Sequence, residues 1–467
     1  MPKPGHVYIY VRPKLTASAA ALVATLALAA PAHAVDDPAT TFTNKAGEAL
    51  SHTCRDKGQP EETCNQLPVG KHASPKAVAV HADSWAHRAL ALQHELANDV
   101  PLADAPWVGT HNSFNSPAYG LTPSRGDSNQ QLSLTDQLRI DVRSLELDIH
   151  FFNGQPRVCH ATGEHIGCST EGGVGPFFDE IATFLDEPSR EDQVVLLYLE
   201  DHIGNAADYE TVTSELERAF GAKLYRSAGG ECSPKLPLDL SRADVLAQGA
   251  QVIAVASGCG GGGDWSSMVF DWSGDVHSES RPNGFQDFPG CGPDFDRATY
   301  DDRIVRYFED STFVTSTAST VGAAGTDEGL TPETTAAMMR CGVDLTGFDQ
   351  LLPDDGRLEA SVWSWAEGEP ARRRCAVQGD DGRWEAVWCK RGRRPAACRT
   401  ASGSWLVTQK AVRSKRASAA CAKQGAAFAV PRTGYENELL RQAKADEATV
   451  WLGHGRAAEG WRALDPR

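Results

Sequence analysis

Stretches with two different hydrophobic periods alternate along the first three quarters of the chain. Apolar residues recur every three to four positions in several stretches, which indicates amphipathic helices. We expect these helices at residues 85–96, 134–140, 176–187 and 209–220. Shorter apolar runs typical of strands lie at residues 144–150, 194–199, 251–256 and 342–345. Strands that alternate with helices favour an α/β fold with a parallel sheet.

Two of the expected strands carry acidic residues at positions suited to a catalytic site. In the run 144–150, apolar residues alternate with Glu146 and Asp148, so both carboxylates point to the same side of one strand. The run 194–199 is continuously apolar, as in a strand buried on both faces, and ends in Glu200. The carboxyl ends of parallel barrel strands are where barrel enzymes place their catalytic groups.

A glycine-rich segment, residues 258–263, lies in a long irregular stretch that runs from about residue 257 to 300. No Lys-Ser/Thr pair follows the glycines and we expect no helix after them, so a phosphate-binding loop is not indicated. A loop tethered by Cys259 is the better interpretation.

Shifts in composition divide the 467 residues into four parts. Residues 1–34 have the features of a secretory signal peptide, with basic residues before an apolar run and small residues at the cleavage site 32–34. Residues 35–80 form a polar lead-in, and residues 81–355 form the main domain. No other apolar run is long enough to suggest a membrane span, so we expect a secreted protein, extracellular or periplasmic.

The last part, residues 356–467, is rich in cysteine and tryptophan. It holds four of the 12 cysteines and seven of the 11 tryptophans, which predicts a small disulfide-held domain. A faint similarity of residues 421–453 to lectin-like domains makes carbohydrate binding one interpretation. Tryptophans that form a core are the simpler alternative.

Twelve cysteines behind an export signal favour disulfides, because the compartment is oxidising. No Cys-x-x-Cys motif occurs. Short separations suggest three pairs. These are Cys54 with Cys64, Cys159 with Cys168, and Cys232 with Cys259. The sequence alone leaves the connectivity open.

The formal net charge of −17 argues against nucleic acid as a partner, because phosphate backbones require a basic surface. Two basic clusters, 372–374 and 390–394, stand out against this acidic background. Peripheral contact with an anionic membrane is one interpretation of these clusters. An ordinary solvated surface is the simpler one.

Four short motifs carry the candidate chemistry. They are Gly109-Thr110-His111-Asn112-Ser113, Leu145-Glu146-Leu147-Asp148, Val158-Cys159-His160 and Leu197-Tyr198-Leu199-Glu200-Asp201-His202. Their order and spacing resemble the X domain of phosphatidylinositol-specific phospholipases C. The resemblance implies a TIM-type (β/α) barrel, regular or distorted. It also implies a phosphodiesterase that cleaves phosphatidylinositol to diacylglycerol and a cyclic or acyclic inositol phosphate.

The resemblance further implies the catalytic roles. His160 would protonate the departing diacylglycerol oxygen, and His111 would hydrogen-bond a phosphoryl oxygen or act as base. Glu146 or Glu200 could take the proton of the attacking inositol hydroxyl. These proton transfers require two groups that titrate near neutrality. Their neighbours His150 and His202 are expected in supporting or structural roles.

Calcium-dependent members of the family bind Ca²⁺ through one asparagine and three acids. These positions fall on Asn112, Glu146, Asp148 and Glu200. All four side chains offer oxygen, the ligand atom that Ca²⁺ requires. Metal-free members carry an arginine on the Glu-x-Asp strand, and this chain keeps both acids. It is therefore placed with the calcium-using type, although Arg139 and Arg143 lie near in sequence.

Two departures from the family pattern leave parts of this interpretation open. Ala161 stands where glycine is common, and the nearby His165 competes with His160 as the second catalytic histidine. No counterpart is found for the basic residues that eukaryotic members use for ring phosphates. Unphosphorylated phosphatidylinositol is therefore the favoured substrate.

The same residues also allow other interpretations. His111 could be a buried structural histidine, and Glu146 and Asp148 could form salt bridges with Arg139 or Arg143. Glycerophosphodiester phosphodiesterases also use two histidines and a Glu-x-Asp pair, but they typically begin with His-Arg instead of His-Asn. A secreted, inactive protein that binds carbohydrate or envelope is the alternative from another class.

Overall fold

The computed structural model describes residues 73–120, 128–160, 168, 171–279, 285–292, 295–313, 315–316, 329–444, 448–457 and 460–464. Several expectations lie outside these residues. They concern the signal peptide, most of the lead-in, the Cys54–Cys64 pair, and the positions Ala161 and His165.

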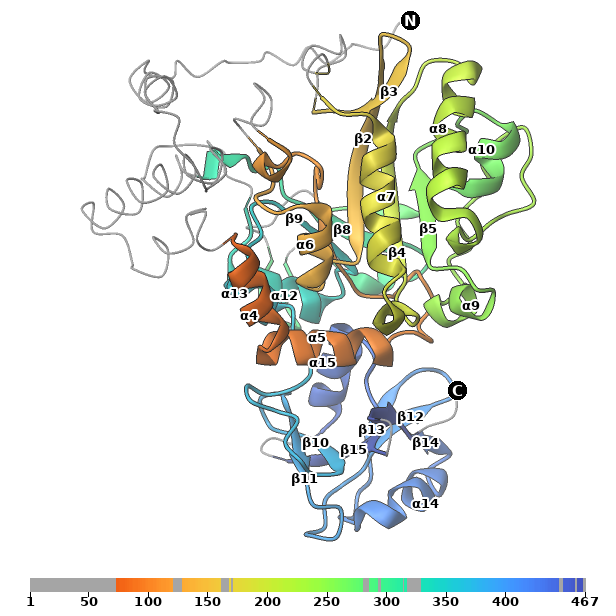
Figure 1. Ribbon diagram of the computed structural model, residues 1–467. Helices are drawn as coiled ribbons and strands as arrows, with labels where there is room; N and C mark the ends of the chain where they lie inside the picture. The colour runs from red at the N-terminus through yellow and green to blue at the C-terminus, as the bar shows by residue number, and fades with distance from the viewer. Residues whose placement is uncertain are drawn as a thin grey trace, which may run out of the picture.

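Eight parallel strands form a curled sheet at the centre of the larger part of the molecule (Figure 1). In spatial order they are β6 (Val269–Asp271), β5 (Val252–Ala256), β4 (Val195–His202), β2 (Ser144–Phe152), β1 (Trp107–Thr110), β9 (Leu345–Phe348), β8 (Ile304–Phe308) and β7 (Val276–Ser278). Within the described residues no ladder joins the outer strands β6 and β7. The sheet is an open TIM-type barrel, which confirms the expected fold class and places the distortion at this edge.

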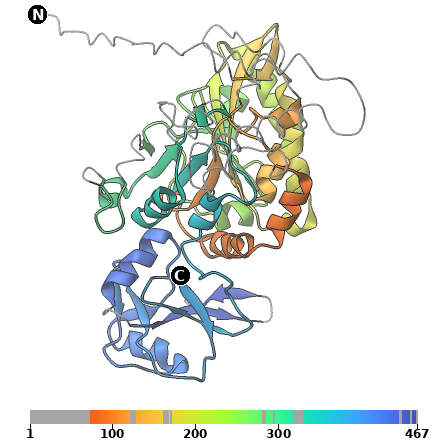
Figure 2. The same cartoon turned by 90° about the vertical axis from the view of Figure 1, so that its left-hand side faces the viewer.

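Helices cover the outer face and the lower end of this sheet (Figures 1 and 2). They are α4 (Pro75–Ala82), α5 (Trp85–Leu96), α6 (Leu134–Arg139), α7 (Val174–Leu185), α8 (Ala206–Phe220), α9 (Arg242–Ala247), α10 (Gly263–Met268), α12 (Pro332–Cys341) and α13 (Gly356–Ala360). Side chains at the N-caps fix several starts, since Ser84, Ser133 and Asn205 each accept a backbone N–H from the first turn. The four helices expected from the sequence are all present; α5 has the expected bounds, and the other three differ at one or both ends.

The alternation of side chains along the strands separates two apolar layers. On β4, Leu197 and Leu199 pack among the helices, whereas Leu196 and Tyr198 belong to the cluster inside the barrel. On β2 the residues that flank the acids also face the helices. Glu146, Asp148 and Glu200 must therefore point into the barrel, because successive side chains in a strand alternate.

The described part of the segment 257–300 contains more regular secondary structure than expected. It contains α10 and the edge strands β6 and β7, so the expectation that no helix follows the glycines is wrong. The glycines allow close packing, since a Cβ on Gly260 or Gly261 would overlap the ring of Trp265 or Tyr209. The last barrel strand also begins later than expected, because Gly342 ends α12 in the left-handed conformation at φ +90°.

Two of the three suggested disulfides are present, Cys159–Cys168 and Cys232–Cys259. Three more pairs join the remaining described cysteines. They are Cys291–Cys341, Cys375–Cys389 and Cys398–Cys421. The bond at Cys159 also anchors the end of β3 (Gln155–Val158), which pairs antiparallel with the carboxyl half of β2.

The C-terminal region contains two small antiparallel sheets. One has the order β11 (Trp384–Val387), β10 (Cys375–Gln378), β15 (Val450–Arg456), β16 (Trp461–Ala463), and the other β13 (Trp405–Val407), β12 (Ala397–Thr400), β14 (Ala426–Phe428). Two helices accompany them, α14 (Ala417–Ala422) and α15 (Gly434–Ala443). Six of the region's tryptophans are core side chains and only Trp388 is exposed, which gives no support to a tryptophan platform for sugars.

This region packs below the barrel, at the end opposite the β2–β3 hairpin (Figure 1). The contact is polar as well as apolar: Gln93 on α5 accepts backbone N–H bonds from Trp363 and Ser364, and Arg432 pairs with Asp99. The two basic clusters belong to this region, so they lie far from the carboxyl ends of the barrel strands. Among the described residues, every helix is too short or too polar to span a bilayer.

Candidate active site

His111 and Asn112 directly follow β1, at the carboxyl end of the barrel. The strand approaches its neighbours closely at Gly109, where a Cβ would lie 3.0 Å from Ser144 Cβ and from Thr346 O. Ser113 then fixes the turn against β2: its N–H donates to Glu146 O (3.0 Å) and its Oγ accepts the Glu146 N–H (2.9 Å). The motif thus uses small residues to bring the His111 backbone beside β2.

Three carboxylates gather next to this turn. Glu146 and Asp148 come from β2, and Glu200 is the β4 residue paired with Asp148 in the parallel ladder. Each offers an oxygen, and these three oxygens lie within 4.8 Å of one another. Glu146 and Asp148 are only 2% and 5% exposed. Close, desolvated carboxylates repel each other, so this arrangement favours a bound cation or proton.

The pKa values of the carboxylates reflect this crowding. Burial, together with the charge of Glu200, raises the pKa of Glu146 to about 7, although His111 opposes the shift. Burial and the two glutamates raise the pKa of Asp148 well above its usual range. The hydrogen bond from His202 lowers the pKa of Glu200. A cation held by these oxygens would relieve the repulsion that raises the first two values.

The alternative in which Glu146 and Asp148 pair with nearby arginines is wrong. Arg139 forms its ion pairs with Asp136 and Glu187. The Arg143 side chain donates to Gln193 and to backbone carbonyls of residues 138 and 142.

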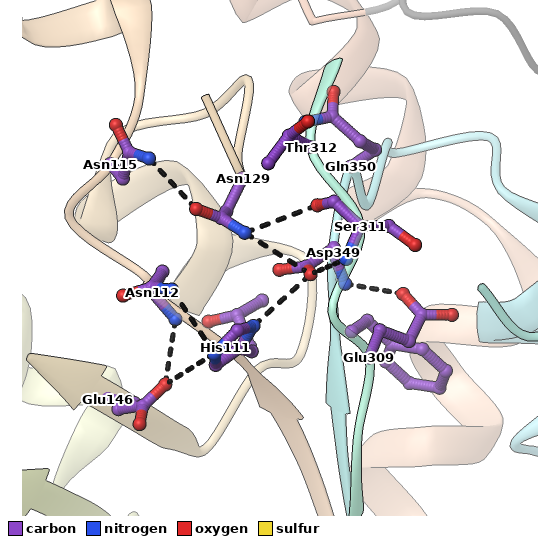
Figure 3. A network of polar contacts seen from close by, with 12 residues as sticks. His111, Asn112, Asn115, Asn129, Glu146, Glu309, Ser311, Thr312, Asp349 and Gln350 are labelled. Carbon is purple, nitrogen blue, oxygen red and sulfur yellow. Dashed lines mark hydrogen bonds and ion pairs between the residues drawn. The ribbon is translucent and has the colours of Figure 1, made fainter. Parts of the chain in front are cut away.

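His111 lies between the carboxylate cluster and a further acid, Asp349 (Figure 3). Its Nδ1 is 3.2 Å from Asp349 Oδ2 and its Nε2 is 3.6 Å from Glu146 Oε2. Burial alone would lower the pKa of His111, but Asp349 and Glu146 outweigh it and raise the pKa to about 10. With only 15% of its side chain exposed, His111 is a partly buried histidine held in the cationic form by acids.

Asp349 is a site residue that the sequence reasoning missed. Its Oδ2 also accepts hydrogen bonds from Ser311 N (2.7 Å) and Asn129 Nδ2 (3.3 Å), and Glu309 accepts the Asp349 N–H. Arg357 in turn pairs with Glu309 at 2.7 Å. Asp349 directly follows β9, so the strand-end signal that identified Glu200 could have identified it too.

Asn112 links the histidine to the acids. Its backbone, at φ +45°, donates its N–H to Glu146 Oε2 at 2.8 Å. In one amide orientation Oδ1 lies 3.0 and 3.1 Å from the two Asp148 oxygens, a contact between acceptors that a bound cation would stabilise. In the other orientation Nδ2 donates to Asp148 and Oδ1 accepts from His111 Nε2. The all-oxygen set of Asn112, Glu146, Asp148 and Glu200 therefore fits a hard cation such as Ca²⁺.

The other expected histidines lie around this centre. His202 Nε2 donates to Glu200 Oε1 at 3.1 Å, and its ring stacks on His150 with centroids 4.2 Å apart. His160 is exposed and follows Cys159, whose N–H donates to Asp148 O at 3.2 Å. The structure thus brings together His111, His202 and the four oxygen-bearing side chains expected from the sequence, and it places the His160 backbone directly after a residue that contacts β2.

Arg306 on β8 is a second residue that the sequence reasoning missed. Its guanidinium carbon lies 4.7, 5.0 and 5.2 Å from the ring centroids of Phe308, Trp272 and Tyr198. Nε donates to Ser278 Oγ at 2.9 Å, but its buried Nη1 has no hydrogen-bond partner among the described residues. Phe308 also contacts the His111 ring, with centroids 5.8 Å apart. An unpaired cation under the site would attract an anionic substrate.

An open TIM-type barrel that carries histidine and carboxylate side chains at the carboxyl ends of its strands has the arrangement of a barrel enzyme. The family described as "Rv2075c PI-PLC-like domain" matches residues 66–355, and the chain belongs to it. The family match makes the protein a phosphodiesterase-type enzyme of the PI-PLC-like class.

The chain is also similar to individual proteins and solved structures. The chain is 43% identical to uncharacterized protein Rv2075c of Mycobacterium tuberculosis over 431 residues, which cover 87% of each chain. It is 28% identical to a PI-PLC X domain-containing protein of Arabidopsis thaliana over 112 residues, 23% of this chain and 26% of the other. Phosphatidylinositol-specific phospholipase C from Listeria monocytogenes matches with a TM-score of 0.38 and 11% identity, over 57% of this chain and 98% of that one.

Proposed function

We propose that this protein is an exported, calcium-dependent phospholipase C that cleaves phosphatidylinositol. The observation that carries the proposal is the group of three inward-facing carboxylates whose oxygens lie within 4.8 Å of one another, with His111 beside Glu146. The PI-PLC-like family supports the reaction class. The five disulfides among the described residues support action in an oxidising compartment.

In the proposed reaction the inositol 2-hydroxyl attacks phosphorus, and the bond from phosphorus to the diacylglycerol oxygen breaks. Asn112, Glu146, Asp148 and Glu200 would hold Ca²⁺, which when bound lowers the pKa of the attacking hydroxyl and offsets phosphoryl charge. Asp349 fixes Nδ1 of His111 and leaves Nε2 to donate a hydrogen bond to a phosphoryl oxygen. The hydroxyl proton passes to Glu146 or Glu200, and His160 protonates the departing oxygen.

This chemistry predicts a cyclic inositol phosphate as the first product. Phosphorus NMR of micellar phosphatidylinositol should show its signal with added Ca²⁺, and excess EGTA should lower the rate by at least about 10³-fold, since the metal contributes several kcal/mol. Ca²⁺ should restore activity where Zn²⁺ does not. Full turnover in EGTA would remove the calcium assignment.

The same assay separates the alternative functions. Cleavage of glycerophosphoinositol but not of phosphatidylinositol would identify a glycerophosphodiester phosphodiesterase. Inactivity toward both substrates would favour a binding protein.

We also propose that Arg306 attracts the phosphate of the substrate. Arg306→Met should lower kcat/KM by about 10- to 100-fold, mainly through KM, because a charge-assisted contact contributes about 1.5–3 kcal/mol. The melting temperature should stay equal or rise, since the variant removes a half-buried guanidinium whose Nη1 has no partner among the described residues, and methionine can pack against the same rings.

Arg306→Lys is the matched control, because it keeps the charge while losing the planar stacking. It should retain more activity than Arg306→Met. A fall in melting temperature with unchanged kcat/KM in Arg306→Met would show that the residue only supports the fold.

A further inference from the structure

A second group of metal-ligating side chains lies away from the site described above. His81 on α4, His87 on α5 and Asp141, which follows α6, converge near the amino-terminal end of β2. Asp141 Oδ2 is 2.9 Å from His81 Nε2, and Asp141 Oδ1 is 2.9 Å from His87 Nδ1. One ligand atom from each residue lies within 4.8 Å of the other two. Glu146 and Asp148 lie further along the chain, as the third and fifth residues of β2.

The hydrogen bond on the far side of His81 restricts its chemistry. His81 Nδ1 lies 2.9 Å from the carbonyl oxygen of Pro353, and a carbonyl can only accept, so the ring proton is on Nδ1. In a neutral ring Nε2 then presents a lone pair to Asp141 Oδ2, which is itself an acceptor. A cation must lie between these two atoms, either an added proton or a metal ion. A backbone carbonyl behind the ring is the usual support of a metal-bound histidine.

The remaining groups suit a metal as well. Asp141 is 8% exposed, and its backbone is in the left-handed region at φ +75°. Its carboxylate contacts both histidines. His87 is 24% exposed on its side chain, and a surface hollow lined by His81, Ser84 and Pro353 opens beside it. Solvent can therefore reach the cluster and supply a water ligand. Asp141 Oδ2 lies 2.9 Å from His81 Nε2 and 3.0 Å from His87 Nδ1, so these atoms would have to move apart by a few tenths of an ångström to reach the about 3.3 Å between neighbouring ligands of tetrahedral zinc.

We propose that His81, His87 and Asp141 bind a Zn²⁺-class transition metal, with water as the fourth ligand. Two imidazole nitrogens and one carboxylate match zinc, whereas Ca²⁺ prefers sets made only of oxygens. The ion would tie α4 and α5 to the turn before β2 and so stabilise the junction of the N-terminal helices with the barrel. Its role is structural and independent of the reaction proposed for the barrel mouth.

The test measures metal content and stability of the untagged full chain. After equilibration with micromolar ZnSO₄ and desalting, elemental analysis should find about one zinc per chain, and zinc should raise the melting temperature. His87→Gln removes a partly exposed ligand, and it should weaken zinc binding by at least about 100-fold and abolish the thermal shift. Circular dichroism checks that this variant is folded.

His277→Gln is the matched control, because His277 has a similarly exposed side chain, 26%, and lies outside the cluster. It should retain zinc, and so should Glu146→Gln, which separates this ion from the one at the mouth. Equal zinc in His87→Gln and the parent protein would show adventitious binding and overturn the proposal. Absence of retained zinc in the parent protein would also overturn it and leave a proton between His81 and Asp141.

Discussion

Glu146→Gln is expected to lower the rate of phosphatidylinositol cleavage by about 10³-fold, equivalent to about 4 kcal/mol of lost transition-state stabilisation. The substitution keeps an oxygen that can accept the Asn112 N–H, which now lies 2.8 Å from Glu146 Oε2. It removes the central negative charge of the oxygen set and a candidate proton acceptor. The measurements are kcat and KM over a Ca²⁺ titration, with calcium affinity followed by calorimetry.

A buried glutamate far from the mouth supplies the control for this substitution. Glu438 on α15 is as shielded as Glu146, with 4% of its side chain exposed against 2%, and it pairs with Arg441. Glu438→Gln should reduce stability while kcat and calcium affinity stay unchanged. If Glu146→Gln kept both parental activity and parental calcium affinity, the carboxylate cluster would not be the metal site.

His111→Ala is expected to lower kcat by about 10⁴-fold, and Asp349→Asn by about 10²-fold, within the usual range for positioned acid-base groups. The two effects should not add, because Asp349 acts through its contact with His111 Nδ1. The double variant should therefore be little slower than His111→Ala alone. Kinetics of the four proteins on one substrate give the coupling directly.

The pH dependence adds a second readout for the same pair. Asp349 raises the pKa of His111, so its removal should lower that pKa and shift the alkaline loss of activity to lower pH. Asp344 is a matched control at the other end of β9, 5% exposed, where it accepts the Val305 N–H. Asp344→Asn should cost stability and leave the pH profile in place. Additive effects of His111→Ala and Asp349→Asn would contradict the proposed pairing.

The position of the C-terminal region bears on how such an enzyme would meet lipid. The basic clusters at 372–374 and 390–394 lie on this region, below the barrel, while the β2–β3 hairpin extends from the opposite end. A membrane that presents substrate to the carboxyl ends of the strands would therefore not also contact these clusters. The structure makes the solvated surface the simpler interpretation of the basic residues.

Local sequence patterns determined those features of this protein that depend on a single continuous segment of the chain. The two-residue alternation in β2 placed Glu146 and Asp148 on one side, and the apolar run of β4 ended at Glu200, as the structure shows. Short motifs at strand ends then indicated both the barrel and the family. These predictions succeed because strand periodicity is a property of consecutive residues.

Only the tertiary structure decided which strand ends meet. Asp349 is 238 residues from His111 along the chain, and the two come together because β1 pairs with β9 when the parallel sheet curls. Arg306 reaches the layer under His111 for the same reason, through β8 and the ring of Phe308. The cluster of His81, His87 and Asp141 likewise depends on how α4 and α5 pack below the barrel. Contacts between distant segments follow from chain topology and packing. A periodic pattern within one segment carries no information about either.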